Sequence, residues 1–309
     1  MSCETSGSPP YWKRIELKKS QAKLMSIVYL NGQYMPIEQA KISPMDRGFL
    51  FGDGIYEVVP SLEGRFIGLG PHIDRFLKGL AAIEIHHSFS RELFKDICVS
   101  LSEKNGGGNL GIYLHVSRGA DTKRYHAFPE DIQPTLFAYT FTISDSAIDA
   151  PVKTYKVATQ TDLRWQHCDI KSTALLGNVL HFQQSHAAGY DETLLFNAKD
   201  ELTEAAACNV FVVRDGVVST PLLDSQKLPG ITRLLLLKIL TEHSDQEVHE
   251  RVITKQEVMS ADEIWLTSST RQVAPVVSVD ERVLGSGEPG PIWKQAHALF
   301  CRHQFDYND

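Results

Sequence analysis

The sequence predicts an α+β fold in two domains. Strand-like and helix-like runs follow one another without the regular strand–helix–strand rhythm of a parallel α/β sheet. Residues 144–151 contain turn residues and few large apolar ones, which indicates a boundary between a small N-terminal domain over residues 26–144 and a larger C-terminal domain over residues 152–309. Residues 1–25 are mostly polar and lack the apolar core of a signal peptide, so we expect a disordered extension there.

The N-terminal half contains both strand and helix patterns. Runs rich in β-branched and aromatic residues predict strands over residues 27–30, 56–62, 112–117 and 136–141. Apolar residues at spacings of three and four predict helices over residues 71–83 and 91–101. Asn31-Gly32 and Glu63-Gly64 are typical of the turns that end the first two strands. The polar segment 118–133 lies between the last two strands and predicts a loop that faces a ligand.

The C-terminal half begins a new series of elements. Strand patterns cover residues 155–159, 193–196, 264–267 and 273–279. A hairpin is predicted over residues 209–220, because Asp215-Gly216 is a strong two-residue turn signal. Helices are predicted over residues 173–187, where Leu176, Val179 and Leu180 fall in step, and over residues 231–240.

Composition excludes several classes of function. The chain has 309 residues, of which 42% are hydrophobic and 22% charged, as is typical of soluble globular proteins. Its net charge of -7 and its scattered Lys and Arg make nucleic acid and anionic membranes unexpected partners. No apolar run approaches the roughly 20 residues of a membrane span. The five cysteines form no CxxC pair, so we expect reduced thiols in a cytoplasmic protein.

Two further patterns give weak signals. Residues 106–111 match GxGxxG, but a helix pattern precedes them and a strand pattern follows. This order is the reverse of a dinucleotide-binding turn, so a flexible turn is favoured. The spacing of His181 and His186 does not place two rings on one helix face, and no metal site is predicted.

The most informative segment is residues 162–172, which lies between a strand pattern and a helix pattern. Loops at such junctions often carry function. Lys171 follows Ile170 and precedes the helix, a position where partial desolvation would favour amine nucleophilicity and Schiff-base chemistry. An exposed lysine at a helix start would give the same pattern, and composition does not decide between the two.

Several motifs in a fixed order resemble class IV (fold type IV) pyridoxal-phosphate enzymes. They are Asp169-Ile170-Lys171-Ser172, Leu202-Thr203-Glu204, Asn209-Val210-Phe211 and Gly230-Ile231-Thr232-Arg233. Upstream, residues 46–57 and 72–75 are similar to the N-terminal signatures of this family, and the resemblance runs from about residue 29 to about residue 279. It implies a small N-terminal α/β domain and a larger, β-barrel-like C-terminal domain with helices, which binds pyridoxal 5'-phosphate.

The resemblance implies a role for each matched residue. Lys171 would hold the cofactor as a Schiff base and move the substrate proton, Glu204 would pair with the pyridine nitrogen, and Arg75 would bind the phosphate. Further cofactor contacts would come from Leu228, Ile231, Thr232, Ser268 and Ser269. Outside the family, Arg75 and Glu204 would pass for solvated residues and Leu228 for a core residue. The chain departs from many relatives at Ala205-Ala206-Ala207-Cys208, where they carry small residues that include serines.

The substrate is indicated by residues 118–129, which resemble the carboxylate-binding loop of D-amino-acid aminotransferases. Arg124, His126, Phe128 and Pro129 match its pattern, although the loop is one residue longer. Arg124, His126 and Tyr56 would then bind the substrate carboxylate, and the loop would reach the active site of a partner subunit in a homodimer. A basic loop tip without this role remains an alternative reading.

The resemblance therefore predicts transamination between a D-amino acid, such as D-alanine or D-glutamate, and a 2-oxo acid. The same family includes branched-chain L-amino-acid aminotransferases and aminodeoxychorismate lyase, which share the cofactor residues. A non-catalytic protein that binds pyridoxal phosphate is a further alternative, against which the retention of Lys171, Glu204 and Arg75 argues.

Overall fold

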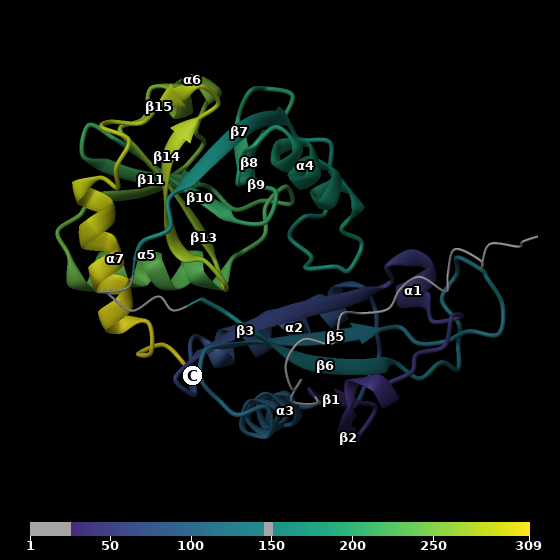
Figure 1. The fold of residues 1–309 in the computed structure, drawn as a ribbon. Helices are drawn as coiled ribbons and strands as arrows, with labels where there is room; N and C mark the ends of the chain where they lie inside the picture. The colour runs from purple at the N-terminus through teal and green to yellow at the C-terminus, as the bar shows by residue number, and fades with distance from the viewer. Residues whose placement is uncertain (1–25, 145–150) are drawn as a thin grey trace, which may run out of the picture.

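The structure, a computed structural model, describes residues 26–144 and 151–309 (Figure 1). It has two sheets, each with its own helices and core, and the predicted two-domain α+β fold is confirmed. The expected disordered extension, and residues 145–150 of the expected boundary, lie outside the described residues. Within the described ranges, no helix combines the length and apolar character needed to cross a bilayer.

The N-terminal domain is an antiparallel sheet of six strands in the order β2-β1-β6-β5-β3-β4. The strands are β1 (Ile27–Leu30), β2 (Gln33–Pro36), β3 (Gly54–Leu62), β4 (Arg65–Phe66), β5 (Leu110–Ser117) and β6 (Thr135–Thr142). Helices α2 (Leu69–Ala82) and α3 (Arg91–Lys104) pack on the sheet, and a short helix α1 (Arg47–Phe51) precedes β3. Alternate β5 residues Ile112, Leu114 and Val116 are fully buried against these helices. The intervening residues Tyr113 and His115 are half-buried on the opposite face.

The C-terminal domain is a mixed sheet of nine strands in the order β12-β11-β10-β13-β14-β7-β8-β9, with β15 paired to β14. The strands are β7 (Tyr155–Thr161), β8 (Glu192–Phe196), β9 (Leu202–Ala205), β10 (Asn209–Arg214), β11 (Val217–Pro221), β12 (Val248–Arg251), β13 (Glu263–Ser268), β14 (Gln272–Val279) and β15 (Arg282–Val283). The helices are α4 (Leu176–Ala187), α5 (Ile231–His243), α6 (Lys255–Met259) and α7 (Pro291–His303). The sheet curls, and α5 and α7 lie together on one side of it (Figure 1).

Most predicted elements are present, and two differences are informative. The helix expected from residue 173 begins at Leu176, because the Thr173 N–H donates to Gly54 O at 2.9 Å and thereby ties this residue to β3. The α7 helix was not predicted. Its signal is present in the sequence, since Pro291 occupies the first turn and Trp293, Ala296 and Phe300 form its buried stripe.

The lysine segment is fixed where the two domains meet. The Tyr56 N–H donates to Lys171 O at 3.0 Å, and Ile55 and Ser172 form an isolated bridge. A residue of the C-terminal half is thus held by the first residues of a strand in the N-terminal half.

Candidate active site

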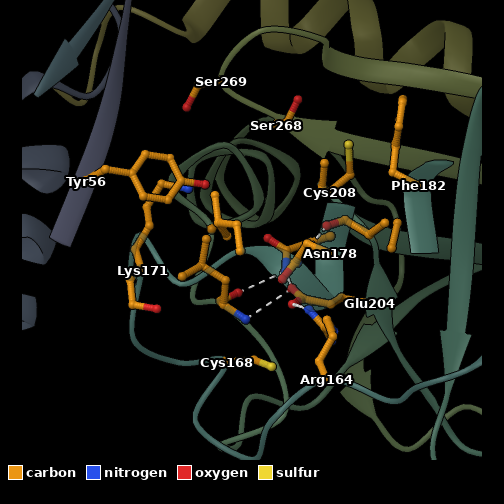
Figure 2. A pocket seen from close by; sticks show the side chains of 18 of the residues that line it. Tyr56, Arg164, Cys168, Lys171, Asn178, Phe182, Glu204, Cys208, Ser268 and Ser269 are labelled. Atoms are coloured by element: carbon orange, nitrogen blue, oxygen red, sulfur yellow. Dashed lines mark hydrogen bonds and ion pairs between the residues drawn. The ribbon is translucent and has the colours of Figure 1, made fainter. Parts of the chain in front are cut away.

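A cavity of about 360 Å³ lies between the two domains and contains most of the predicted site residues (Figure 2). Tyr56 and Arg75 line it from the N-terminal domain, and Lys171, Glu204, Leu228, Ile231, Thr232, Ser268 and Ser269 from the C-terminal domain. The fold therefore brings together residues that are more than two hundred positions apart in the sequence.

Lys171 lies in this cavity beside an aromatic stack. Its Nζ is 4.2 Å from the centroid of the Tyr56 ring, a cation–π contact. The Tyr56 ring stacks in turn on Tyr113, with 5.6 Å between centroids and 25° between planes. The stack restrains the Tyr56 ring, so its phenol is held next to the lysine amine.

Glu204, at the end of β9, is the best-anchored acid in the cavity (Figure 2). Its Oε1 accepts from Arg164 Nη1 at 2.5 Å, and its Oε2 accepts from Asn209 Nδ2 at 3.1 Å and from the Leu228 N–H at 3.0 Å. Burial raises the pKa of Glu204, and the Arg164 guanidinium opposes that shift without cancelling it. Arg164 is also held by Asp162, whose Oδ2 lies 2.7 Å from Nη2.

Arg75 projects from α2 and is oriented by a fully buried acid. Its Nε and Nη2 donate to Glu57 at 2.9 and 2.7 Å, and its Nη1 donates to Pro229 O at 2.8 Å. His72 Nδ1 lies 3.0 Å from the same carboxylate. Burial raises the pKa of Glu57, but Arg75 and then His72 more than offset this and hold the pKa well below its usual range. The contact with Pro229 brings the guanidinium close to the start of α5.

The start of α5 can accept an anion. Its N-cap is Gly230, and no described side chain caps the helix, so the first N–H groups lack a side-chain acceptor. A side chain at Gly230 could not fit, because a Cβ there would collide with Asn209 Oδ1. Within the described chain, the buried Thr267 Oγ1 has no hydrogen-bond partner, and Thr267 also lines the cavity.

These groups fit a phosphate-bearing pyridine cofactor. One end of the cavity offers a guanidinium, uncapped N–H groups and an unpaired hydroxyl, which together suit a phosphate. Glu204 offers a buried carboxylate of the kind that suits a ring nitrogen, and Lys171 offers an amine. The residues present therefore match the donor set that the resemblance implies.

The departure at Ala205-Ala206-Ala207-Cys208 places a thiol at the cavity wall. Cys208 Sγ lies 3.4 Å from Arg271 Nη1 and 3.8 Å from Glu192 Oε2. Burial raises the pKa of Cys208 to about 12, so the group is a neutral thiol at physiological pH.

Arg124 and His126 do not line this cavity within the same chain. Both lie on the loop of residues 118–133, and both contact Phe51. The Arg124 guanidinium carbon is 5.1 Å from the Phe51 ring centroid, and the His126 ring centroid is 5.3 Å from it.

Several residues of the site were missed by sequence reasoning. Arg164 and Asp162 lie within residues 162–172, but no sequence pattern indicated that Arg164 contacts Glu204 or that Asp162 contacts Arg164. Glu57 falls within the matched N-terminal motif and Thr267 directly precedes Ser268, yet neither was named as a site residue. Their positions beside recognised residues were the available signal.

A cluster of metal-binding residue types lies elsewhere, at the C-terminal ends of α5 and α7. Ligand atoms of His243, His303 and Asp306 lie within 4.8 Å of one another. The two rings stack in parallel at 3.7 Å and 8°, and His303 Nδ1 is 2.8 Å from Asp306 Oδ2. Parallel rings direct their nitrogen lone pairs side by side and not toward a common point, so this is a stacked pair with a hydrogen bond and not a preformed metal site.

Comparison with known proteins identifies the family. Residues 54–279 match Amino-transferase class IV. A D-alanine aminotransferase of Bacillus licheniformis is 37% identical over 268 residues, covering 86% of this chain and 93% of the relative. That of Staphylococcus haemolyticus is 33% identical over 281 residues, covering 90% of this chain and 98% of the relative.

Solved structures share the fold. The branched-chain amino acid aminotransferase of Escherichia coli aligns with a TM-score of 0.84 at 22% identity, over 92% of this chain and 96% of that one. The branched-chain enzyme of Thermobaculum terrenum, in its pyridoxal-phosphate form, gives a TM-score of 0.82 at 21% identity, over 92% of this chain and 95% of that one. Together with the cavity geometry, the family match and the relatives establish that this chain belongs to the class IV aminotransferase family and is a pyridoxal-phosphate-dependent aminotransferase.

Proposed function

We propose that the enzyme transfers an amino group between a D-amino acid, such as D-alanine or D-glutamate, and a 2-oxo acid. The convergence of Lys171, Glu204 and the anion-accepting end of Arg75 and α5 in one cavity carries the proposal of amino-group transfer. These residues are shared across the family, so the choice of a D-amino acid rests on the loop of residues 118–129 and on the relatives. The relatives that are named D-alanine aminotransferases, at 33% and 37% identity, support the substrate class.

The cavity is assigned to pyridoxal 5'-phosphate. Arg75, the N–H groups of Ile231 and Thr232, and the hydroxyls of Ser268 and Ser269 would hold its phosphate. Glu204 would accept from the ring nitrogen, and Leu228 would contact one ring face. When bound, this cofactor supplies an aldehyde that exchanges amines and a ring that withdraws electrons from the substrate Cα.

Lys171 is assigned the proton transfer. Its amine would accept the proton from the substrate Cα as a general base and donate a proton again as a general acid. The bound cofactor would supply the carbonyl group that takes up the amino group of the donor and later gives it to the acceptor. The Tyr56 ring, 4.2 Å from Nζ, limits where the amine can swing. The segment that carries Lys171 is tied to β3, which keeps its backbone fixed during the exchange.

Glu204 must remain an acceptor for this chemistry. Burial raises its pKa, which favours the protonated form, and the 2.5 Å contact with Arg164 favours the charged form. Arg164 donates to Oε1, whereas the Leu228 N–H and the Asn209 amide donate to the other oxygen, Oε2. The three donors orient the carboxylate, and Arg164 and the Leu228 N–H also oppose the upward shift of its pKa.

The substrate carboxylate is assigned to Tyr56, Arg124 and His126. Tyr56 lines the cavity, whereas the loop with Arg124 and His126 lies outside it in the same chain. We infer that the loop serves the cavity of a second copy in a homodimer. The exposed stripe of α4 supports this, because Leu176, Val179 and Leu180 are 70%, 56% and 61% exposed.

Stereochemistry follows from this placement. If the carboxylate is held on the loop side while Lys171 takes the Cα proton from one fixed face, only one enantiomer presents its hydrogen to the amine. The other must place its side chain where the carboxylate binds. Losing that charge-assisted contact should slow turnover by about a hundred-fold.

Amino-donor assays of the purified enzyme test the proposal. With a 2-oxo acid acceptor, D-alanine and D-glutamate should be consumed rapidly and L-leucine only slowly. Turnover of L-leucine or L-isoleucine without D-alanine would assign a branched-chain enzyme instead. Release of pyruvate from aminodeoxychorismate without transamination would assign a lyase, and cofactor binding with no turnover of any of these would assign a non-catalytic protein.

A further inference from the structure

We propose that Arg47, Asp53 and Arg118 form a positioning unit for the loop of residues 118–133, and that this unit determines how tightly the enzyme binds substrate carboxylates. The inference rests on the proposed function, in which Arg124 and His126 of that loop bind the carboxylate. Arg47 is the first residue of α1, Asp53 directly precedes β3, and Arg118 directly follows β5.

A single carboxylate holds both arginines. Arg47 Nε donates to Asp53 Oδ2 at 2.8 Å, and Arg118 Nε and Nη2 donate to Oδ2 and Oδ1 at 2.8 and 3.0 Å. The Arg47 and Arg118 side chains are only 3% and 4% exposed. Two buried guanidinium groups that share one carboxylate have N–H donors left over, and buried donors without acceptors are costly.

The loop backbone supplies the acceptors for Arg47. Nη1 donates to Tyr125 O at 2.6 Å and to Ala127 O at 3.4 Å, and Nη2 donates to His126 O at 3.1 Å. Arg47 is therefore satisfied only when three successive loop residues hold this backbone conformation. The burial of Arg47 and the conformation of the loop depend on each other.

Arg118 fixes the base of the same loop. Its Nη2 and Nη1 donate to Ile83 O at 2.6 Å and to Glu84 O at 3.0 Å, just beyond the end of α2. Its guanidinium carbon lies 3.5 Å from the ring centroid of Phe128, which is otherwise 51% exposed. The far end of the loop thus rests on a side chain that is itself anchored to Asp53.

Phe51 connects this unit to the residues assigned to the substrate. The guanidinium carbons of Arg47 and Arg124 lie 4.9 and 5.1 Å from the centroid of its ring, and the His126 ring lies 5.3 Å from it. One aromatic ring therefore contacts the anchor and both substrate-binding side chains. Arg47 sets the loop backbone, and Phe51 sets where the Arg124 guanidinium is presented.

Arg47→Lys tests the unit directly, because lysine keeps the charge beside Asp53 but has no planar fork to reach three carbonyls. We expect the KM for D-alanine to rise about ten-fold, with kcat changed less than about two-fold, and turnover of an amine without a carboxylate to stay unchanged. Tryptic cleavage after Lys123 and Arg124 should become about ten-fold faster.

Phe51→Leu is the second variant and leaves the buried ions intact. It should raise the KM for D-alanine and the rate of tryptic cleavage after Lys123 and Arg124, each by a smaller factor than Arg47→Lys does. Arg251→Lys is the matched control, since Arg251 pairs with Glu257 at the surface of the other domain and is 40% exposed. It should change neither readout.

An unchanged rate of tryptic cleavage in both Arg47→Lys and Phe51→Leu would refute the proposal that the positioning unit holds the loop. Faster cleavage with an unchanged KM for D-alanine would overturn its role in substrate positioning. The digestion needs no turnover, so a failure of the unmodified enzyme to use D-alanine would refute the proposed function while the digestion still decides whether the anchor holds the loop.

Discussion

Arg164 Nη1 lies 2.5 Å from Glu204 Oε1, and the two side chains are 2% and 7% exposed. The guanidinium counteracts the effect of burial on the pKa of an acid that lines the cavity between the two domains. Asp162 contacts the same guanidinium, so one cation holds two carboxylates. The charge state of Glu204 therefore depends on a residue forty positions earlier in the chain.

Arg164→Gln should lower kcat by about ten-fold to a hundred-fold, because without the guanidinium the pKa of Glu204 rises further and the protonated acid is a poor acceptor. A raised folded-state pKa gives stability that is present below the unfolded pKa and lost as pH rises through the folded pKa. The thermal stability deficit of the variant should therefore be larger at pH 8 than at pH 5. Removing Arg164 also raises the pKa of Asp162, which Arg164 holds below its usual value against burial, and this acts in the same direction. A deficit that shrinks as pH rises would contradict the assignment.

Glu57→Gln tests the acid that orients Arg75. We expect weaker binding of pyridoxal phosphate and a loss on the order of 3 kcal/mol in the free energy of unfolding at neutral pH, because a buried ion pair loses one partner. The depressed pKa of Glu57 gives stability that is present above the usual value of 4.5 and lost as pH falls through the folded pKa. The stability difference between the two proteins should therefore narrow as pH falls below about 4.5.

The control for this measurement repeats the pair on a His72→Asn background. His72 contacts the same carboxylate, and burial lowers its pKa more than Glu57 raises it. Without the imidazole, protonation of His72 cannot contribute to the pH dependence, so the narrowing of the stability difference reports on Glu57. A difference that is constant from pH 6 to pH 3.5 would show that Glu57 does not carry a depressed pKa.

Site residues that belong to contiguous motifs could be predicted from the sequence, whereas the distant residues that contact them could not. Lys171, Glu204 and Thr232 belong to short contiguous motifs, and all three line one cavity. The partners that tune them lie at other positions, such as Glu57 for Arg75 and Arg164 for Glu204, and only folding brings them into contact. Hydrophobic periodicity found α2 and α3, whose stripes face their own sheet. The same periodicity found α4, but no local pattern could tell that its stripe of Leu176, Val179 and Leu180 is exposed in the single chain.

Lys171→Ala should lower transamination by about a thousand-fold or more, because none of the other described residues that line the cavity carries an amine to bond the cofactor and move the proton. After borohydride reduction, mass spectrometry of the unmodified protein should find the cofactor mass on the peptide with Lys171. Lys227→Ala is the control, since Lys227 is 8% exposed and pairs with Asp224 at 2.7 Å. It should keep both activity and labelling, and label on any lysine other than Lys171 would refute the assignment.

Hybrid dimers test whether the loop serves the partner's cavity. A dimer with one Lys171→Ala chain and one Arg124→Ala chain can be isolated by two different affinity tags. If Arg124 acts across the interface, the site built on the intact Lys171 receives its Arg124 from the other chain, and the hybrid should show about half of the unmodified activity on D-alanine. If Arg124 acts within its own chain, each site lacks one residue, and the hybrid should be as weak as the two parent variants. A hybrid of unmodified and Lys171→Ala chains calibrates the assay, because one intact site remains in it under either arrangement.

Leu176→Glu and Val179→Glu together should abolish dimer formation if the α4 stripe lies in the interface, since burying two carboxylates against an apolar surface is costly. A variant that still elutes as a dimer would place the interface elsewhere and remove the support that α4 gives to the shared site.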